Sequence, residues 1–218
     1  MHVSASILSC DLLNLETEIE NLEKAGIDSL HVDIMDGHFV PNISFGVDMV
    51  KQLRLISNLP INVHLMVDNP KQFIDSISHC NVECLIIHSE IKQNIENTLK
   101  NIKRHGMDVG LAISPQTQIV EVMQYLPLVD FALIMGVPPG FGGQKLIEPV
   151  LSKIGEIRSI HHKITIGLDG GVNENTIALI KAAKPDTLVV GNYLLASFQK
   201  KNRLDDIKEK LKILCQRK

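Results

Sequence analysis

The chain has 218 residues, of which 44% are hydrophobic and 22% charged, a composition typical of a globular protein with one large core. Its net charge of −3 and isoelectric point near 6.3 provide no basic surface for nucleic acid or an anionic membrane. No apolar run approaches the roughly 20 residues that span a bilayer. A strand-like run begins directly after Met1, so we expect no signal peptide. We therefore expect a cytoplasmic protein that binds neither nucleic acid nor membrane.

The cysteines agree with this location. They are too sparse for a disulfide framework and fit a reducing compartment: Cys10, Cys80, Cys84 and Cys215. A zinc cluster of His79, Cys80, Cys84 and His88 is an alternative. We expect Cys80 at the end of a helix and Cys84 on the next strand, however, which separates these side chains and favours core cysteines.

Short apolar runs alternate with amphipathic segments, and each such pair predicts a strand followed by a helix. The first strand is predicted at 3–8 and its helix at 14–25, with Asn14 as cap and Gly26 as stop. The second pair is a strand at 29–34 and a helix at 47–56. The third is a strand at 61–67 and a helix from Pro70 to about Cys80. The fourth is a strand at 84–88 and a helix at 94–105.

The second half continues the pattern. Strands are predicted at 108–113, 131–135, 164–168 and 187–190, and helices at 117–126, 149–161, 174–183 and about 204–214. The strands are short and apolar, as expected of parallel strands covered by helices. Eight strand–helix units without a linker predict one (β/α)8 TIM-barrel domain over residues 1–218. A doubly wound sheet is the alternative.

Polar and metal-capable side chains occur where several predicted strands end, which is where (β/α)8 barrels place functional groups. They are Ser6, His31, Asp33, His64 and Asp169. His31 and Asp33 share one face of their strand, while Val32 and Ile34 face the other way, toward the helices.

An imidazole and a carboxylate buried side by side must be paired, metal-bound or catalytic, because burying a lone charge is too costly. An ordinary His31–Asp33 ion pair in the core is one interpretation. The convergence of His31, Asp33, His64 and Asp169 at matching strand ends favours another, a four-ligand site for zinc or a similar divalent ion.

Glycines gather after the last three predicted strands, in the segments Gly140-Phe141-Gly142-Gly143, Gly170-Gly171 and Gly191-Asn192. Glycine lets backbone N–H groups approach an anion closely, and phosphate sites in these barrels commonly follow strands seven and eight. Each pair alone also fits an ordinary turn. Three clusters on one rim predict a phosphate-binding site.

Four further side chains have two interpretations each. Met35, Met66 and Met135 either fill the core or form an apolar wall that keeps water from a reactive intermediate. His88 either orients a neighbour or is a satisfied strand histidine, and we do not assign it as a metal ligand.

Together these motifs resemble the ribulose-phosphate 3-epimerase family of metal-dependent sugar-phosphate epimerases. The matching segments are SIL at 6–8, HVDIMDGHFVPN at 31–42, HLMV at 64–67, GM at 106–107, PGFGGQ at 139–144 and DGGV at 169–172. They cover nearly the whole chain in the family's order and spacing. The combination of the second segment with the PGFGGQ loop is highly specific.

The resemblance implies a barrel of the ribulose-phosphate-binding type that interconverts D-ribulose 5-phosphate and D-xylulose 5-phosphate in the pentose phosphate pathway. It implies His31, Asp33, His64 and Asp169 as ligands of one divalent ion, zinc first, with iron, manganese or cobalt as alternatives. It implies substrate contacts from Ser6, His64, Asp169 and the three glycine segments. We also expect a homo-oligomer.

The chemistry agrees with this implied role. Inverting a carbon beside a ketone requires that a proton be removed from one face and returned to the other. A carboxylate with a pKa of about 4 is too weak a base to do this unaided. A divalent ion on the carbonyl oxygen would stabilise the enediolate by several kcal/mol. We assign Asp33 as the base in one direction and Asp169 as the acid, with exchanged roles in reverse.

Three positions depart from the family pattern. Gly136 stands where Thr or Ser is usual, Pro138 where Asn or Glu is common, and Asn192 where Ser is usual. Pro138-Pro139 stiffens a loop that should close over the substrate, and Asn192 offers phosphate a donor with a different reach. These departures spare the metal set and bear on substrate and rate. They leave two alternatives, an epimerase of another ketose phosphate such as D-allulose 6-phosphate and a catalytically silent sugar-phosphate binder. A third alternative is a metal-free barrel decarboxylase or synthase with the same phosphate rim.

Overall fold

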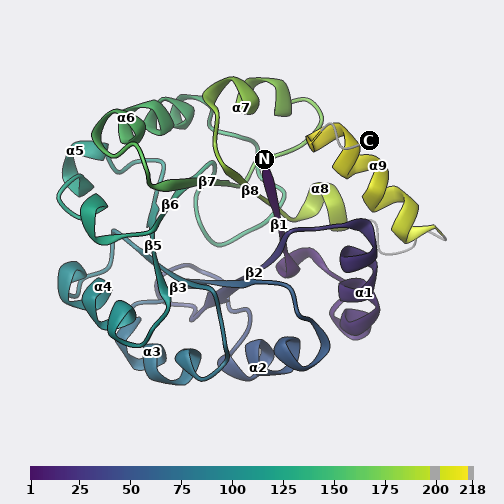
Figure 1. The fold of residues 1–218 in the computed structure, drawn as a ribbon, viewed down its shortest axis with the longest axis horizontal. Coiled ribbons are helices and arrows are strands. Elements are labelled where there is room, and N and C mark those ends of the chain that lie inside the picture. Colours follow the sequence, from purple (N-terminus) through teal and green to yellow (C-terminus); the bar gives the residue numbers. More distant parts are fainter. Residues whose placement is uncertain (197–201, 216–218) are drawn as a thin grey trace.

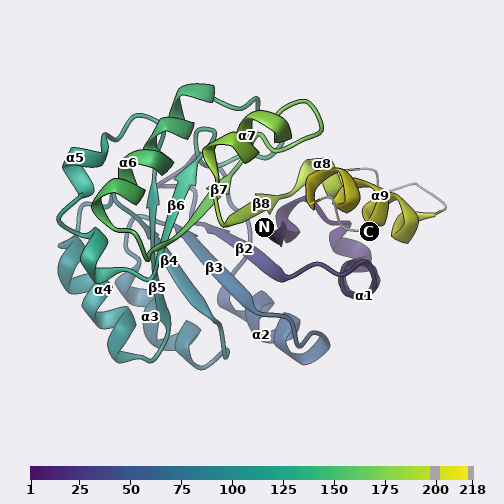
Figure 2. The same ribbon diagram turned by 45° about the horizontal axis from the view of Figure 1, so that its top comes forward.

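Eight parallel strands form a closed barrel in sequence order, with helices around the outside (Figures 1 and 2). This computed structural model describes residues 1–196 and 202–215. The strands are β1 (His2–Ser6), β2 (Ser29–Met35), β3 (Ile61–Met66), β4 (Cys84–His88), β5 (Asp108–Ile113), β6 (Phe131–Met135), β7 (Thr165–Asp169) and β8 (Thr187–Val190). Parallel pairing of β1 with β8, which sets Val3 opposite Leu188, closes the barrel. The (β/α)8 prediction is confirmed, and the doubly wound alternative is wrong.

Helices cover the outer face of the barrel. They are α1 (Leu15–Ala25), α2 (Val47–Ile56), α3 (Lys71–Ser78), α4 (Ile95–Arg104), α5 (Ile119–Val122), α6 (Ser152–Ile160), α7 (Ile177–Ala183), α8 (Asn192–Leu195) and α9 (Arg203–Cys215). A buried ion pair, 2.6 Å between Arg203 Nη2 and Glu18 Oε2, joins α9 to α1. Within the part of the chain that the structure describes, no helix is long and apolar enough to cross a membrane.

Strand bounds follow the prediction closely, and helix starts less so. The Asn14 cap is wrong, because its side chain donates to Asp11 and does not cap α1. The helix predicted at 117–126 shrinks to α5, and the chain continues into a 3-10 turn, Leu126–Leu128, that contains Pro127. The helix predicted at 174–183 begins later, at Ile177, because side-chain bonds within 171–176 compete with the helix.

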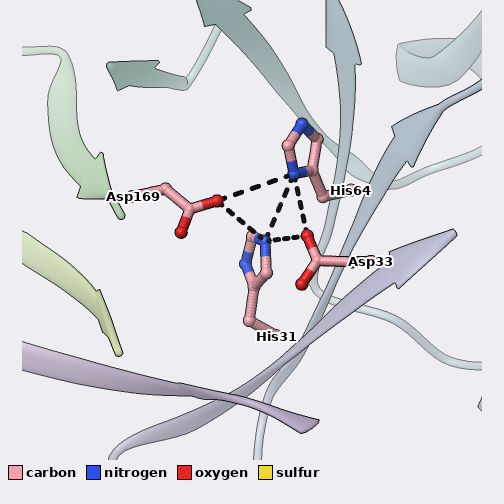
Figure 3. Close-up of side chains that lie close together, drawn as sticks. All are labelled: His31, Asp33, His64 and Asp169. Carbon is pink, nitrogen blue, oxygen red and sulfur yellow. Dashed lines mark hydrogen bonds and ion pairs between the residues drawn. The ribbon is translucent and has the colours of Figure 1, made fainter. Parts of the chain in front are cut away.

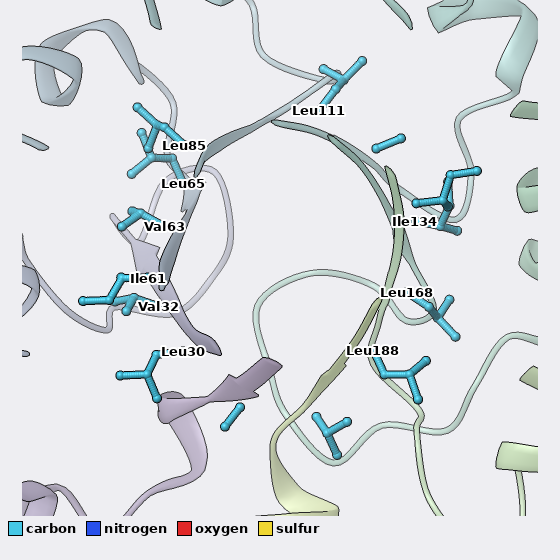
Figure 4. Close-up of a cluster of buried hydrophobic side chains, with 14 of the residues drawn as sticks. Leu30, Val32, Ile61, Val63, Leu65, Leu85, Leu111, Ile134, Leu168 and Leu188 are labelled. Atoms are coloured by element: carbon cyan, nitrogen blue, oxygen red, sulfur yellow. The ribbon is translucent and has the colours of Figure 1, made fainter. Parts of the chain in front are cut away.

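Side chains on the strands alternate between two apolar layers. Those facing outward pack under the helices, among them Leu30, Val32, Ile61, Val63, Leu65 and Leu168 (Figure 4). A smaller cluster within the barrel contains Cys84, Ile86, Ala112, Leu133 and Val189. Cys80 belongs to the outer layer, and all four cysteines are free. The two cysteines of the alternative zinc cluster thus lie in separate layers, and the prediction of core cysteines holds for them.

Candidate metal centre and active site

The register of the strands brings four polar side chains to one point at the carboxyl end of the barrel. On β2, Asp33 lies opposite His64 of β3, and His31 lies two residues earlier on the same face. Asp169 is the last residue of β7. Figure 3 shows the four side chains pointing toward a common centre. Parallel strands produce this convergence because their carboxyl ends all meet at one rim.

The four groups have the spacing of a metal site. His64 Nδ1 lies 3.1 Å from Asp33 Oδ1 and 3.4 Å from His31 Nε2. His31 Nε2 is 3.2 Å from Asp33 Oδ1, and both histidine nitrogens are 3.8 Å from Asp169 Oδ2. Tetrahedral zinc with bonds of about 2.0–2.1 Å would hold its ligand atoms roughly 3.3–3.4 Å apart. The donors therefore fit a divalent ion after shifts of a few tenths of an ångström.

Burial and mutual charge perturb all four groups. Burial opposes a charge on His31, but the adjacent Asp33 carboxylate outweighs it and raises the pKa of His31 above its usual value. Burial also acts to raise the pKa of Asp33, yet the two histidines hold it well below its usual range. Burial lowers the pKa of His64 to about 4. Burial, with the negative charge of Asp33, raises the pKa of Asp169 to about 7. The two carboxyl groups thus hold protons with very different strength.

A cavity of about 340 Å³ opens beside these carboxylates. Its lining includes Ser6, Asp33, Asp169, Gly140, Phe141, Gly142, Gly143, Gly170, Gly171, Gly191 and Asn192, which are predicted site residues, and also Met35, Met66 and Met135. Among the predicted substrate contacts, His64 does not line the cavity, because its ring is fully buried between Asp33 and His88. The Asp33 and Asp169 carboxylates and the glycine rim thus face one space.

Ser6 has a second contact that the sequence did not predict. Its hydroxyl donates to Asp33 Oδ2 at 2.8 Å, while His64 lies against the other oxygen, Oδ1. The Asp33 side chain is only 5% exposed, whereas that of Asp169 is 17% exposed. Asp33 is therefore held on both oxygens, and Asp169 is the more accessible carboxylate.

The loop between β6 and α6, which lines the cavity, is held by bonds within itself and by contacts with two other segments. Gln144 Nε2 donates to the carbonyls of Pro138 and Phe141 within the loop. Asn42, from the loop after β2, donates to the Gly140 carbonyl at 2.7 Å. A Cβ atom at Gly143 would lie 2.4 Å from Asn192 Nδ2, so the loop also packs closely on the start of α8. Asn42 was part of the matching segment but was not singled out.

His88 and Glu90 were not assigned to the site, yet they adjoin it. His88 Nε2 lies 2.9 Å from His64 Nε2, and its Nδ1 lies 2.9 Å from Glu90 Oε2. The interpretation of His88 as a residue that orients a neighbour fits this geometry. A signal for Glu90 was present, because His88-Ser89-Glu90 repeats the spacing of His31-Val32-Asp33 at a strand end.

This fold and site define a (β/α)8-barrel enzyme with a buried centre of two histidines and two aspartates next to a glycine-lined pocket. Solved structures agree on the fold. The α subunit of tryptophan synthase from Pyrococcus furiosus, in a mutant form, aligns with a TM-score of 0.74 at 14% identity, over 100% of this chain and 98% of that one. Tryptophan synthase from Mycobacterium tuberculosis aligns with a TM-score of 0.71 over 98% of this chain and 90% of that one.

Sequence comparison identifies the family. The profile of the ribulose-phosphate 3 epimerase family matches residues 2–195. Proteins named ribulose-phosphate 3-epimerase are similar along most of their length. The one from Bacillus subtilis (strain 168) is 36% identical over 94% of this chain and 97% of its own, and the one from Chlamydia pneumoniae is 38% identical over 88% and 86%. The chain belongs to the ribulose-phosphate 3-epimerase family and is an isomerase of the epimerase class.

Proposed function

We propose that this chain interconverts D-ribulose 5-phosphate and D-xylulose 5-phosphate, with Asp33 and Asp169 moving protons at C3. The observation that supports this most directly is the placement of two carboxylates, from β2 and β7, on one cavity with opposite shifts in pKa. Epimerisation requires such a pair, because one group must accept a proton while the other is ready to give one.

Asp33 is suited to be the base. It stays ionised near neutral pH because the adjacent His31 holds its pKa low, and the Ser6 hydroxyl fixes its second oxygen. A fixed carboxylate loses little freedom when it meets the C3 proton.

Asp169 is suited to be the acid in the same direction. In the cation-free chain, burial and the negative charge of Asp33 raise its pKa to about 7, and its side chain is more exposed to the cavity than that of Asp33. In the reverse direction the two residues exchange roles.

The four converging side chains would hold one divalent cation, and we propose zinc because two imidazole and two carboxylate donors suit it, with iron, manganese and cobalt as the other choices. Bound there, the cation would stabilise negative charge that develops on the substrate's carbonyl oxygen. The chain's own contribution is to desolvate the site, since both histidines are fully buried and three methionines wall the cavity.

We place the substrate phosphate at the glycine rim. Gly170 and Gly171 have positive φ angles of 95° and 73°, a backbone conformation that residues other than glycine rarely adopt. Together with Gly191 and Asn192 after β8, these residues line the cavity beyond Asp169. Backbone N–H groups in such loops can bind phosphate without a cationic side chain.

We also propose a cytoplasmic location, supported by the four free cysteines. The homo-oligomer expected from the family resemblance stays a prediction.

The decisive experiment is isotope exchange. Metal-loaded enzyme in D2O should wash deuterium into C3 of D-ribulose 5-phosphate, and Asp33→Asn and Asp169→Asn should each lower that rate by about 10²–10⁴-fold while remaining folded. Near-normal exchange in either variant would refute the two-carboxylate assignment. Ligand binding without exchange would indicate a silent binder, and exchange with D-allulose 6-phosphate alone would indicate another ketose phosphate.

A further inference from the structure

A chain of polar contacts leads from the metal centre toward the surface. His64 presents Nδ1 to Asp33, His31 and Asp169, and Figure 3 shows its second ring nitrogen pointing away from them. That nitrogen, Nε2, meets His88 Nε2 at 2.9 Å, and His88 Nδ1 meets Glu90 Oε2 at 2.9 Å. Both rings are fully buried.

Proton accounting along this chain decides the tautomer of His64. An ionised carboxylate only accepts hydrogen bonds, so His88 donates from Nδ1 to Glu90. A neutral imidazole has one N–H, and His88 Nε2 therefore accepts. His64 must then donate from Nε2, which leaves a lone pair on its Nδ1.

The neighbouring carboxylate favours the opposite tautomer. Asp33 Oδ1 lies 3.1 Å from His64 Nδ1 and would accept a proton placed there. In that tautomer His64 Nε2 would accept from His88 Nε2. His88 Nδ1 would then carry no proton and would face the Glu90 carboxylate with a lone pair. Glu90 thus disfavours the Nδ1–H tautomer of His64, in which Nδ1 has no lone pair for a cation.

Glu90 is held in place without help from the metal centre. Its Oε1 accepts from the Ser114 backbone N–H at 3.0 Å and from the Thr117 hydroxyl. The backbone of this segment is in turn fixed by Lys153, whose Nζ donates to the carbonyls of Ser114, Pro115 and Thr117 at 2.8–2.9 Å. Because the anchor lies in the loop after β5 and on α6, the orientation of His88 is set before any cation binds.

The Glu90 carboxyl group is also held in its ionised form. Burial acts to raise its pKa, but the bonds from His88, Thr117 and Ser114 outweigh burial and lower the pKa of Glu90 to about 2. Its side chain is 27% exposed, at the outer end of the chain of contacts. Glu90 is therefore an acceptor throughout the neutral pH range.

We propose that His88 and Glu90 are positioning residues that hold His64 in the Nε2–H tautomer, so that Nδ1 is free to ligate the divalent cation. This inference rests on the metal centre of the proposed function and adds two residues to it. Partners of this kind behind a histidine ligand commonly change metal affinity by 10–100-fold.

The test measures zinc binding by competition with a chelating dye, without reference to turnover. His88→Phe keeps an aromatic ring but removes the acceptor, and zinc affinity should fall 10–100-fold. His88→Gln offers a carbonyl oxygen to His64 Nε2 and should recover part of the loss. Glu96→Gln, which alters an exposed carboxylate paired with Lys100 on α4, is the matched control and should bind zinc like the parent.

A second measurement does not depend on a variant that folds. Nitrogen-15 spectra of histidine-labelled, zinc-loaded parent protein should show the proton of His64 on Nε2 and that of His88 on Nδ1. The reverse assignment overturns the inference, as does a folded His88→Phe that binds zinc within twofold of the parent, or a parent that takes up no zinc. If zinc binding and tautomers are as described but C3 exchange is absent, the proposed function fails and the positioning role stands.

Discussion

Adding a single methyl group at Gly136 should destabilise this barrel and disturb its metal centre together. Gly136 follows β6, and its N–H donates to the carbonyl of Asp169 at 2.6 Å. A Cβ built at this position would lie 2.4 Å from the Gly170 carbonyl oxygen and 3.2 Å from that of Asp169. Those atoms belong to the backbone, so no side-chain rotation can relieve the contact.

The size of the effect follows from that geometry. Overpacking a close-packed site costs about 1–3 kcal/mol, and a clash with backbone belongs in the upper part of that range. For a domain of this size each kcal/mol lowers the melting temperature by about 2–4 °C, so Gly136→Ala should melt roughly 4–12 °C lower. Because the displaced carbonyl is that of Gly170, directly after the metal-site residue Asp169, zinc affinity should fall as well.

Thermal unfolding followed by circular dichroism, with chelator present, measures the stability term. Gly155→Ala is the matched control, because Gly155 lies within α6 and a Cβ there would meet nothing within 4 Å. Removing a helical glycine should stabilise the protein by about 0.5–1 kcal/mol. If Gly136→Ala melted at or above the parent temperature while Gly155→Ala behaved as expected, the close-approach argument would be refuted. Gly136, where the family usually has Thr or Ser, would then be a neutral departure.

Two further outcomes follow from the site. The pKa of Asp169 is raised to about 7, so below that pH the cation-free carboxyl is protonated and zinc must displace the proton. The apparent affinity for zinc should therefore fall at least about tenfold from pH 6 to pH 5. Above pH 7, this group should change the affinity little. Calorimetric titrations across this range provide the check, and a pH-independent affinity would contradict it. Asn192 accepts from the Ser9 hydroxyl at 2.6 Å and lines the cavity beside Gly143. Asn192→Ala should therefore raise KM for the sugar phosphate roughly tenfold with less effect on kcat, as expected for a lost bond to a charged group. A fall in kcat at unchanged KM would argue against a phosphate contact.

Local pattern was sufficient for much of the barrel. The bounds predicted for β4, β5, β6 and β8 are those observed, because short apolar runs bounded by polar residues identify a buried parallel strand. Helix starts were less predictable. Near Ile177 and Pro127, side-chain bonds and a missing N–H compete with the helix, and those competitors depend on conformation.

The convergence of His31, Asp33, His64 and Asp169 was deduced from sequence. Asp33, His64 and Asp169 lie toward the carboxyl ends of their strands, His31 shares a face with Asp33, and barrel closure brings those ends to one rim. The partners of each side chain were not deduced. Ser6 was expected to contact only substrate, but its hydroxyl donates to Asp33. His88 contacts His64 Nε2 on β3 and the Glu90 carboxylate just after β4.

The amino-acid sequence by itself determined the order of the strands, the face of β2 that carries His31 and Asp33, and the family, because these depend on residue type and on spacing within single elements. Tertiary structure alone decided which nitrogen of His64 faces the centre, how near Gly136 approaches β7, and which of the two aspartates has the raised pKa. These properties depend on distances and burial between strands far apart in sequence, and such contacts exist only once the barrel has closed.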